Sequence, residues 1–431
     1  MGWIAVLAFL IFYGYFNIPF TDALVFRIQD GWCVNSFRDG IGYHCFGDFG
    51  HPLQKGGFPS IYVPENIVSV NSPSIMAMFS LLTLTPYRVS LILYLGLGVV
   101  SCAAPFVNVI RGVSSHLRPI LCFFGLFGTT GFIAAFDRAN PIIFMPGLLW
   151  ALYNSITSEN WRKSSFLIIL LSAIKFWAPI FVVSLLVRKK YRASLVVGVG
   201  VLSVYTLPMV LFDGGFRQNI QNMFGRIFTS NTNALFQPYS VSLTSLIRRL
   251  QCMFTEKSTC LTVDHDWGWT NSIVFNLACA LSIVLAGIFI VKMFVNKSLI
   301  EFTALTAIPI LAIPTAQVYN LVLIVPLVAL LFRSHSGDQT RLMSKFSHNP
   351  VFSISIGLAA SGIPLPIAYF GDSLFSSSNG EPPVFRLNYW STPVIWTSLL
   401  VVLTISAFQK LNEMQRAKNS VLRQQVNRSD L

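Results

Sequence analysis

Charged side chains lie inside or beside apolar runs at three places in this chain, and a charge in such a place usually has a partner or a function. Asp22 follows the first apolar run, and a carboxylate there could remove a proton from a hydroxyl group as a general base. Asp137 and Arg138 separate two apolar runs, and Lys175 lies within a third. A cation at either of these places could bind a phosphate group.

Each position also has a purely structural interpretation. Asp22 could end the apolar run or cap the segment that follows it. Asp137 and Arg138 could pair and shape the turn that leads to Asn140. Lys175 could extend its ammonium group toward lipid headgroups or pair with a carboxylate. The sequence leaves both interpretations open at each of the three places.

A metal site has weaker support in the sequence. Asp264 and Asp266 form an Asp-x-Asp pattern, and two carboxylates at this spacing can hold a divalent cation. The pattern is only three residues long, and no set of Cys and His residues has the spacing of a zinc site. We therefore expect neither a metal ion nor another cofactor.

The composition predicts an all-α, polytopic membrane protein. Of the 431 residues, 54% are hydrophobic and only 11% are charged, against about 25% charged in a soluble domain. A soluble fold of this length could not bury so much apolar surface, whereas a bilayer can. The net charge of +13 is typical of Lys and Arg gathered in cytoplasmic loops, so we do not expect nucleic acid as a partner.

Ten apolar runs are candidates for membrane spans. The first has no basic residue before it and no cleavage site after it, so we expect it to be retained. The segment 165–187 is ambiguous, because Lys175 and Pro179 lie in its middle and basic residues flank both of its ends. The ten candidates, which do not include 165–187, are 3–20, 88–110, 119–136, 141–157, 193–212, 270–293, 299–316, 320–332, 350–370 and 391–408.

Two topologies are compatible with these runs. If 165–187 is a broken hairpin, the chain has about 12 membrane segments; if it is one span, the chain has 11 and an external N-terminus. The counts of Lys and Arg do not separate the two. In the hairpin topology the loop cysteines Cys33, Cys45, Cys252 and Cys260 all lie outside, where disulfides persist. We therefore favour the hairpin, although four free thiols remain the alternative.

The hairpin topology gives one transmembrane domain over residues 1–408 and a polar, basic cytoplasmic tail over 409–431. The main outer loops are 21–87, 213–269 and 371–390, with a short outer turn near 314–320. Twelve of the 17 acidic residues then lie on the outer side, which favours an active site there. No internal repeat is evident in the sequence.

Several short motifs together resemble glycosyltransferase family 87, whose members have the C-type membrane fold and use polyprenyl-phosphate sugars. In that family an acidic residue that opens the first outer loop acts as the catalytic base, and Asp22 matches it. A polar turn, a lysine–proline segment, a serine-rich motif that ends in arginines and a late outer turn match as well. The matching stretches are Asp22–Arg27, Asp137–Asn140, Lys175–Pro179 with 188–192, Tyr239–Arg249 and Pro314–Asn320.

The resemblance implies an inverting glycosyltransferase. It would move a hexose, with mannose suggested by the family, or a pentose to a lipid-linked or envelope glycan acceptor. The site would face outward from the plasma (inner) membrane of a bacterium, with membrane lipids as further partners. Residues assigned to the donor phosphate and sugar are Asp137, Arg138, Asn140, Lys175, Arg248, Arg249, Tyr319 and Asn320.

The chain departs from the family in its late turn, where many relatives place a histidine and this sequence has Tyr319 and Asn320.

Two other classes of protein fit the composition. A secondary transporter or lipid flippase would also have about 12 spans, but it usually shows repeated halves with broken helices at matching places. A scaffolding membrane protein would have no need to bring Asp22, Arg138 and Lys175 to one cavity.

Overall fold

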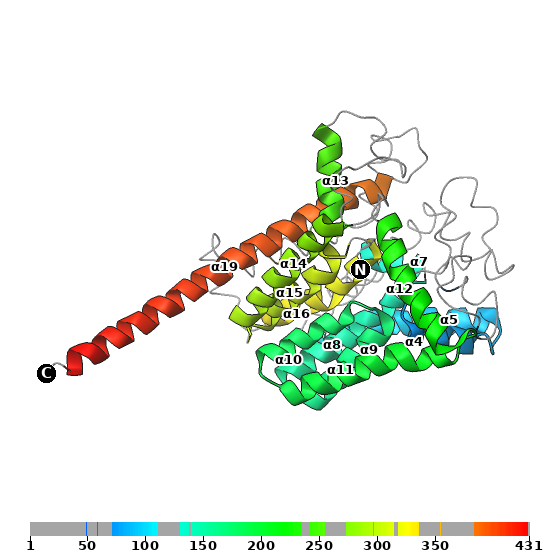
Figure 1. Cartoon of the computed structure of the whole chain (residues 1–431), viewed down its shortest axis with the longest axis horizontal. Helices are drawn as coiled ribbons and strands as arrows, with labels where there is room; N and C mark the ends of the chain where they lie inside the picture. The colour runs from blue at the N-terminus through cyan, green and yellow to red at the C-terminus, as the bar shows by residue number, and fades with distance from the viewer. Residues whose placement is uncertain are drawn as a thin grey trace.

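The computed structural model describes the chain as a bundle of helices (Figure 1), and no strand occurs among the described residues. Four helical stretches in this part are long and apolar enough to cross a membrane: Val89–Val107, Tyr191–Val210, Val274–Met293 and Thr392–Ser420. The protein is therefore an all-α membrane protein. The described residues are 49, 58, 71–110, 130–137, 139–234, 241–254, 273–295, 297–313, 318–335, 354 and 383–429.

Short 3-10 helices, labelled η, alternate with α-helices along the chain. In order, the elements are α4 (Pro73–Leu82), α5 (Tyr87–Ile110), α7 (Thr130–Asp137), η2 (Pro141–Phe144), α8 (Met145–Thr157), α9 (Trp161–Ile174), η3 (Ala178–Val182), α10 (Val183–Val187), α11 (Tyr191–Thr206), η4 (Leu207–Val210), α12 (Gly215–Ala234), α13 (Leu243–Phe254), α14 (Ile273–Met293), α15 (Ser298–Leu311), η6 (Val318–Ile324), α16 (Val325–His335) and α19 (Pro383–Ser429).

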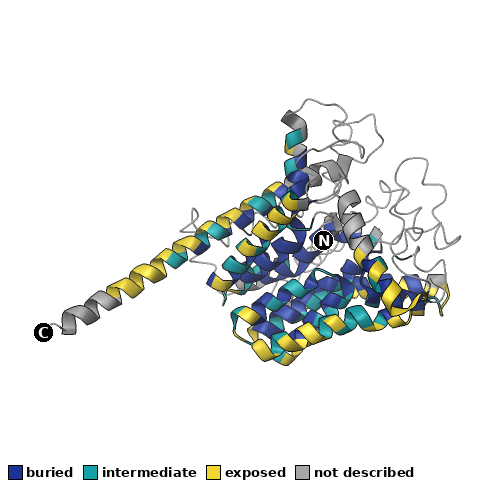
Figure 2. Cartoon of the chain, viewed as in Figure 1, coloured by how far each residue is buried: buried dark blue, intermediate teal, exposed yellow. Residues whose placement is uncertain are grey.

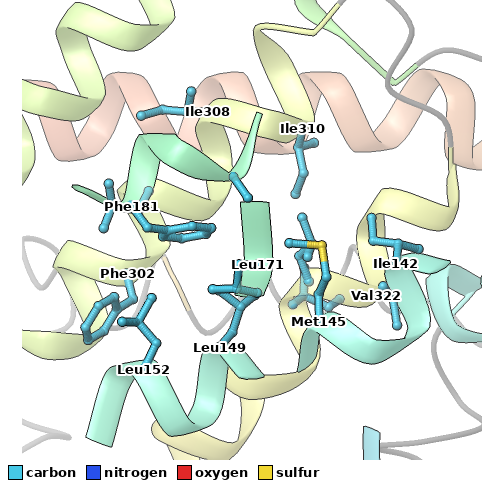
Figure 3. Packing of buried hydrophobic residues seen from close by; sticks show 14 of the residues in the cluster. Ile142, Met145, Leu149, Leu152, Leu171, Phe181, Phe302, Ile308, Ile310 and Val322 are labelled. Carbon is cyan, nitrogen blue, oxygen red and sulfur yellow. The ribbon is translucent and has the colours of Figure 1, made fainter. Parts of the chain in front are cut away.

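The helices pack as two groups that share one apolar core. One group holds α4, α5 and α8–α11, and the other holds α14–α16 and α19 (Figure 1). Buried residues lie between the groups and exposed ones on the outside (Figure 2). The ring of Tyr153 on α8 stacks on Phe302 of α15 with centroids 3.7 Å apart. Nearby, Leu149, Leu171 and Phe181 fill the core (Figure 3).

The outer surface of α11 shows why this bundle suits a bilayer. Leu195, Val199 and Leu202 are 69%, 60% and 64% exposed, and all three lie on a helix long enough to span. In water such a surface would be a liability, whereas in lipid it is the expected outer face. The exposed apolar side chains are therefore a property of the fold and do not mark a binding site.

The segment 165–187 folds as a hairpin. Its first arm is α9, and its second arm is η3 followed by α10. The ammonium group of Lys190 lies 4.8 Å from the centroid of the Trp161 ring, so the two ends of the hairpin lie side by side. Beyond the hairpin, α11 runs parallel to α9: Ser165 Oγ donates to Ala193 O at 3.1 Å, and farther along both helices a Cβ on Gly200 would lie 2.2 Å from Ile169 Cδ1. The chain thus reverses within this segment instead of crossing once.

Three tight turns bring consecutive helices back on themselves. Each has a non-glycine residue in the left-handed region: Ala139 with φ 49°, Glu159 with φ 55° and Lys189 with φ 58°. At the first turn the N–H of Asn140 donates to Ala135 O at 2.8 Å, and the other two turns close in the same way. This is the Schellman arrangement, in which carbonyl groups at a helix end regain donors. A left-handed non-glycine residue costs roughly 1–2 kcal/mol, so the bonds must offset that strain.

The helix directions give the molecule two chemically different ends. Because α8 and α9 are joined by a tight turn and run antiparallel, Asn140 before α8 and Lys175 after α9 lie at the same end. At the opposite end of the bundle, Glu301 at the start of α15 pairs with Arg188. The end of α15, and Asn320 after it, therefore lie at the same end of the bundle as Asn140. We name this end the polar end, after its buried residues Asn71, Ser72, Asn140, Lys175 and Asn320.

The opposite end, which we name the basic end, carries most of the positive charge of the described helices. It holds the starts of α9, α11 and α15 and the part of α19 that follows Phe408. Lysines and arginines gather there, with few acidic residues among them. These lysines and arginines include Arg162, Lys163, Arg188, Lys189, Lys190, Arg192, Lys292, Lys297, Lys410, Arg416 and Lys418.

Some segments that the sequence analysis treated as loops are helical. Residues 73–82 of the loop 21–87 form α4, because Ser72 caps the helix and Pro73 suits its first turn. The loop 213–269 contains α12 and α13. The tail from residue 409 continues α19 as far as Ser429. The total of about 12 membrane segments and the C-type fold stay predictions, because 3–20, 350–370 except residue 354, and most of 119–136 lie outside the described residues.

Candidate functional site

Lys175 lies at the polar end, where the hairpin breaks. It ends α9 in an extended conformation, with φ −136° and ψ 134°, and its own N–H still donates to Leu171 O at 3.0 Å. Pro179 then lies in the first turn of η3, where its missing N–H is tolerated. The side chain is only 7% exposed, and Nζ donates to the neutral Asn71 Oδ1 at 3.4 Å. The break therefore holds an ammonium group inside the bundle.

Neighbouring helices supply hydrogen-bond donors to the backbone around this break. The hydroxyl of Ser72, at the start of α4, donates to Ala173 O, and Tyr205 OH donates to Phe176 O at 3.2 Å. Ser74 Oγ also donates to Val204 O at 2.5 Å and ties α4 to α11. A free carbonyl in a bilayer costs several kcal/mol. Because the surrounding side chains satisfy these carbonyls, the break at Lys175 is a stable feature of the fold.

The turn at Asn140 is a second break at the polar end. Asn140 is 1% exposed, and its Oδ1 accepts from the N–H of Ile142 at 3.1 Å, which caps η2. On α5, Ser101 bridges the change from η2 to α8: its hydroxyl donates to Phe144 O at 2.7 Å and accepts from the Gly147 N–H at 3.0 Å. The backbone of this predicted site is thus fixed by side chains of another helix.

The third break contains Asn320 and contacts the second. Asn320 is 4% exposed and lies in η6, which packs against both α7 and η2. The contact with α7 is very close, since a Cβ on Gly131 would lie 2.3 Å from Val322 N. Figure 3 shows Ile142 of η2 beside Val322 of η6. The two asparagine turns, which are 180 residues apart in sequence, therefore meet at the polar end.

These two turns share a pattern that the sequence analysis missed. Asn140 is followed six residues later by Pro146, and Asn320 is followed six residues later by Pro326. In both cases a 3-10 helix changes to an α-helix just before the proline, at η2–α8 and at η6–α16. The shared Asn-x5-Pro spacing was the available signal, but it is too short to register as an internal repeat.

The polar end is suited to an anion. Four helical segments begin there: α4, η2–α8, η3–α10 and η6–α16. The start of a helix has N–H groups without intrahelical partners and carries a partial positive charge of roughly half a unit. Together with the ammonium group of Lys175, these starts place positive charge and dipole ends in a region of low dielectric constant. Such an arrangement stabilises phosphate.

Arg248 lies on a different set of helices. It is 3% exposed on α13, which packs against α14 and α19. Ser242 caps that helix by accepting from the Ser245 N–H at 3.2 Å. Burial lowers the pKa of Arg248 to about 10, so the guanidinium group is still charged at neutral pH. The structure therefore supplies a second buried cation besides Lys175.

Several predicted site residues lie outside what the structure describes. Asp22 and Arg138 are outside it entirely, so their roles stay predictions, as do the disulfides of Cys33, Cys45 and Cys260. For Asp137, Arg249, Cys252 and Tyr319 only the helical position is described: Asp137 ends α7, Arg249 and Cys252 lie in α13, and Tyr319 lies in η6. In the described part of the chain, no three His, Cys, Asp or Glu side chains are grouped as metal ligands would be.

Comparison with known proteins identifies the family of the chain. No curated protein and no solved structure is significantly similar to the chain. The sequence model of glycosyltransferase family 87 matches residues 70–342, which is well over half of the chain. The matched region contains all three breaks of the polar end together with Arg248. The chain belongs to glycosyltransferase family 87, and it is a membrane glycosyltransferase.

Proposed function

We propose that the protein transfers a hexose, with mannose as the first candidate, or a pentose from a polyprenyl-phosphate donor to a lipid-linked or envelope glycan acceptor. The observation that carries this proposal is the buried ammonium group of Lys175 at the end of the bundle where four helical segments begin. A polyprenyl-phosphate sugar is a lipid with one phosphate group. Such a donor suits a protein that offers positive charge at the end of a membrane bundle.

The proposed reaction is a single displacement with inversion. The acceptor oxygen forms a bond to the anomeric carbon, and the bond from that carbon to the phosphate oxygen breaks. Asp22 takes the acceptor proton, and polyprenyl phosphate leaves with the bonding electrons. Negative charge on the phosphate grows in the transition state, so Lys175 and Arg138 stabilise it, with Arg248 and Arg249 as further cations. Fixed cations serve in place of a metal ion.

We assign the polar end to the outer face of the plasma membrane of a bacterium. The assignment is supported by the clustering of Lys and Arg at the basic end, because such residues are enriched in cytoplasmic segments. It implies that the donor reaches the site from the outer leaflet. The basic end, with Lys189, Lys190 and Arg192, would then face the cytoplasm.

The test is sugar transfer in membranes that contain the wild-type protein, Asp22→Asn or Lys175→Met, with a panel of labelled polyprenyl-phosphate sugars. We expect label to enter a new product only with the wild-type protein and one or a few donors. Normal transfer by Asp22→Asn would remove Asp22 as the base but keep the enzyme. If the wild-type protein transfers sugar from none of the donors, in membranes that contain native acceptor lipids, the proposed donor class is wrong.

A transporter or flippase of lipid-linked sugars is the second candidate, favoured by the paired Asn-x5-Pro breaks. Repeated broken helices are common in transporters. Membership of a glycosyltransferase family favours the enzyme over the transporter, and one assay separates the two functions. In sealed vesicles a transporter would move labelled lipid between leaflets without a new product, whereas the enzyme would make the product even in detergent.

A further inference from the structure

Two exposed arginines lie at the basic end, each in the first turn of a helix. Arg162 is the second residue of α9, and Arg192 is the second residue of α11. The start of a helix carries a partial positive charge, so a cation placed there does not stabilise the helix. The positions of these two arginines therefore have a reason other than helix stability.

The starts of α9 and α11 lie side by side. The two helices run parallel, and near their starts Ser165 Oγ donates to Ala193 O at 3.1 Å. Lys190 precedes α11, and its ammonium group lies 4.8 Å from the centroid of the ring of Trp161, the first residue of α9. We name this place the cationic patch and define it by Arg162, Lys190 and Arg192.

Helical geometry places the two arginines on the same side of this helix pair. Successive residues of a helix are about 100° apart around its axis. Arg162 follows Trp161, which faces α11, and Arg192 precedes Ala193, which faces α9. On parallel helices that face each other, one step forward on the first and one step back on the second lead to the same side. The two guanidinium groups can therefore reach one ligand.

Each arginine has an exposed apolar residue one turn farther along its helix. Phe166 lies four residues after Arg162 and is 59% exposed, and Val196 lies four residues after Arg192 and is 55% exposed. Residues four apart share one face of a helix. The candidate membrane span that contains α11 begins at Tyr191, so the patch lies at the level of the lipid headgroups. It is thus continuous with the lipid-facing surface of the bundle.

The described residues provide no counter-charge for the patch. None of its three cations forms an ion pair with them, and the buried carboxylate of Glu301 is paired with Arg188 instead. Glu159, in the turn before α9, is exposed and pairs with no described residue either. Three cations gathered at one place without a carboxylate partner favour an anion from outside these helices.

We propose that the cationic patch binds the phosphate group of an anionic phospholipid in the leaflet at the basic end. A guanidinium group can donate two parallel hydrogen bonds to phosphate, and Lys190 adds a positive charge that Trp161 holds in place. The acyl chains of the same lipid cover Phe166 and Val196. A free phosphate ion has no chains to cover this apolar surface, so we assign the site to a lipid.

The inference goes beyond the proposed function. The patch lies at the end of the bundle opposite Lys175, so the bound lipid is neither the donor nor the acceptor of the proposed reaction. The inference rests on the membrane fold alone. A protein that transfers no sugar would still bind the lipid, so the two proposals can fail separately.

The test is native mass spectrometry of the full-length protein in neutral detergent. The ligands are phosphatidylglycerol, phosphatidylcholine with the same acyl chains, and inorganic phosphate. The variant is Arg162→Gln with Arg192→Gln, and the control is Arg416→Gln with Lys418→Gln, which removes the same charge from exposed positions where α19 extends beyond the bundle (Figure 1). We expect the variant to bind phosphatidylglycerol roughly 30-fold more weakly and the control to bind it like the wild type.

A charge-preserving variant tests the role of charge. Arg162→Lys with Arg192→Lys keeps both positive charges but loses the paired donors, so it should weaken binding only about threefold. A loss as large as in the glutamine variant would show that charge is not the cause and would overturn the proposal.

The melting temperature without lipid separates ligand binding from a structural role. The glutamine variant should not melt below the wild type, because the two arginines are exposed, form no ion pair with the described residues and lie at helix starts. A clear fall in its melting temperature would overturn the proposal in favour of a structural role.

The pattern of binding decides the rest. Unchanged affinity of the glutamine variant for phosphatidylglycerol would remove the site. An equal loss in the α19 control would mean that lipid is attracted by the total charge and not by the patch. Equal binding of phosphatidylcholine by the wild type would remove the need for an anionic lipid. Displacement of phosphatidylglycerol by an equal concentration of inorganic phosphate would assign the patch to a soluble anion instead of a lipid.

Discussion

The buried ion pair between Arg188 and Glu301 at the basic end should destabilise the fold strongly when only one of its two partners is removed. Arg188 Nη1 donates to Glu301 Oε1 at 2.6 Å and Nη2 donates to Oε2 at 2.7 Å, in a bidentate geometry. The carboxylate is 0% exposed and the guanidinium group 14% exposed. Arg188 also donates to Ser184 O at 3.0 Å and to Val295 O. One side chain thus joins the hairpin to the connection before α15.

The perturbation is Arg188→Met, which leaves the Glu301 carboxylate buried without its cation. Removing one partner of a buried pair costs about 3–5 kcal/mol. The double variant Arg188→Met with Glu301→Met removes both charges, and such replacements are often close to neutral. We therefore expect the double variant to be more stable than Arg188→Met alone, with a coupling energy of about 3 kcal/mol between the two positions.

The assay is a double-mutant cycle of unfolding in detergent, followed by tryptophan fluorescence. Glu413→Gln, at an exposed position on α19, is the control and should change the free energy of unfolding by less than about 0.5 kcal/mol. Transfer activity below the unfolding temperature should survive in the double variant, because the pair lies at the end opposite Lys175. Additive costs, with coupling below about 0.5 kcal/mol, would refute the reasoning.

Three further predictions follow from the polar end and its supports. Lys175→Met should lower kcat roughly 100- to 1000-fold, because it removes charge stabilisation of the leaving phosphate; a rate near that of the wild type in transfer assays would contradict this. Gly131→Ala should destabilise the fold by about 1–3 kcal/mol through overpacking, whereas Gly96→Ala, with nothing within 4 Å of the new Cβ, should be tolerated, as thermal unfolding can check. Ser101→Ala should cost about 1–3 kcal/mol, because it leaves two backbone groups without partners in the membrane. Ser203→Ala removes only an exposed hydrogen bond to Val199 O and should cost little in the same measurement.

Features that depend on local sequence were predictable. Apolar runs predicted the helices α5 and α14 and the start of the spanning part of α19 within a few residues, because a bilayer demands long apolar stretches. Lys175 stood out because it combines a buried charge with a nearby proline. The family itself was recognised from short motifs, and the match over residues 70–342 confirms it.

Features that depend on contacts between distant segments were not predictable from one sequence. The meeting of Asn140 and Asn320 requires η2 to pack against η6, and no local pattern encodes that contact. Asn71 could not be identified as the neighbour of Lys175, because it lies 104 residues earlier in a segment that was predicted to be a loop. Trp396 lies in an apolar run, where a tryptophan carries no signal until its Nε1 is found without a partner.

The breaks explain why polar residues are concentrated at one end of the bundle. A helix that stops inside a bilayer exposes carbonyl and N–H groups, so each break needs donors and acceptors from neighbouring helices. Ser72, Ser101 and Tyr205 serve this purpose, and each lies beside a break. Once the backbone is satisfied, the helix starts remain as positive dipole ends at the same end of the bundle as Lys175. The same breaks that require polar support therefore create the electrostatic environment that a lipid phosphate needs, which is why the structural and the chemical interpretations of Lys175 are compatible.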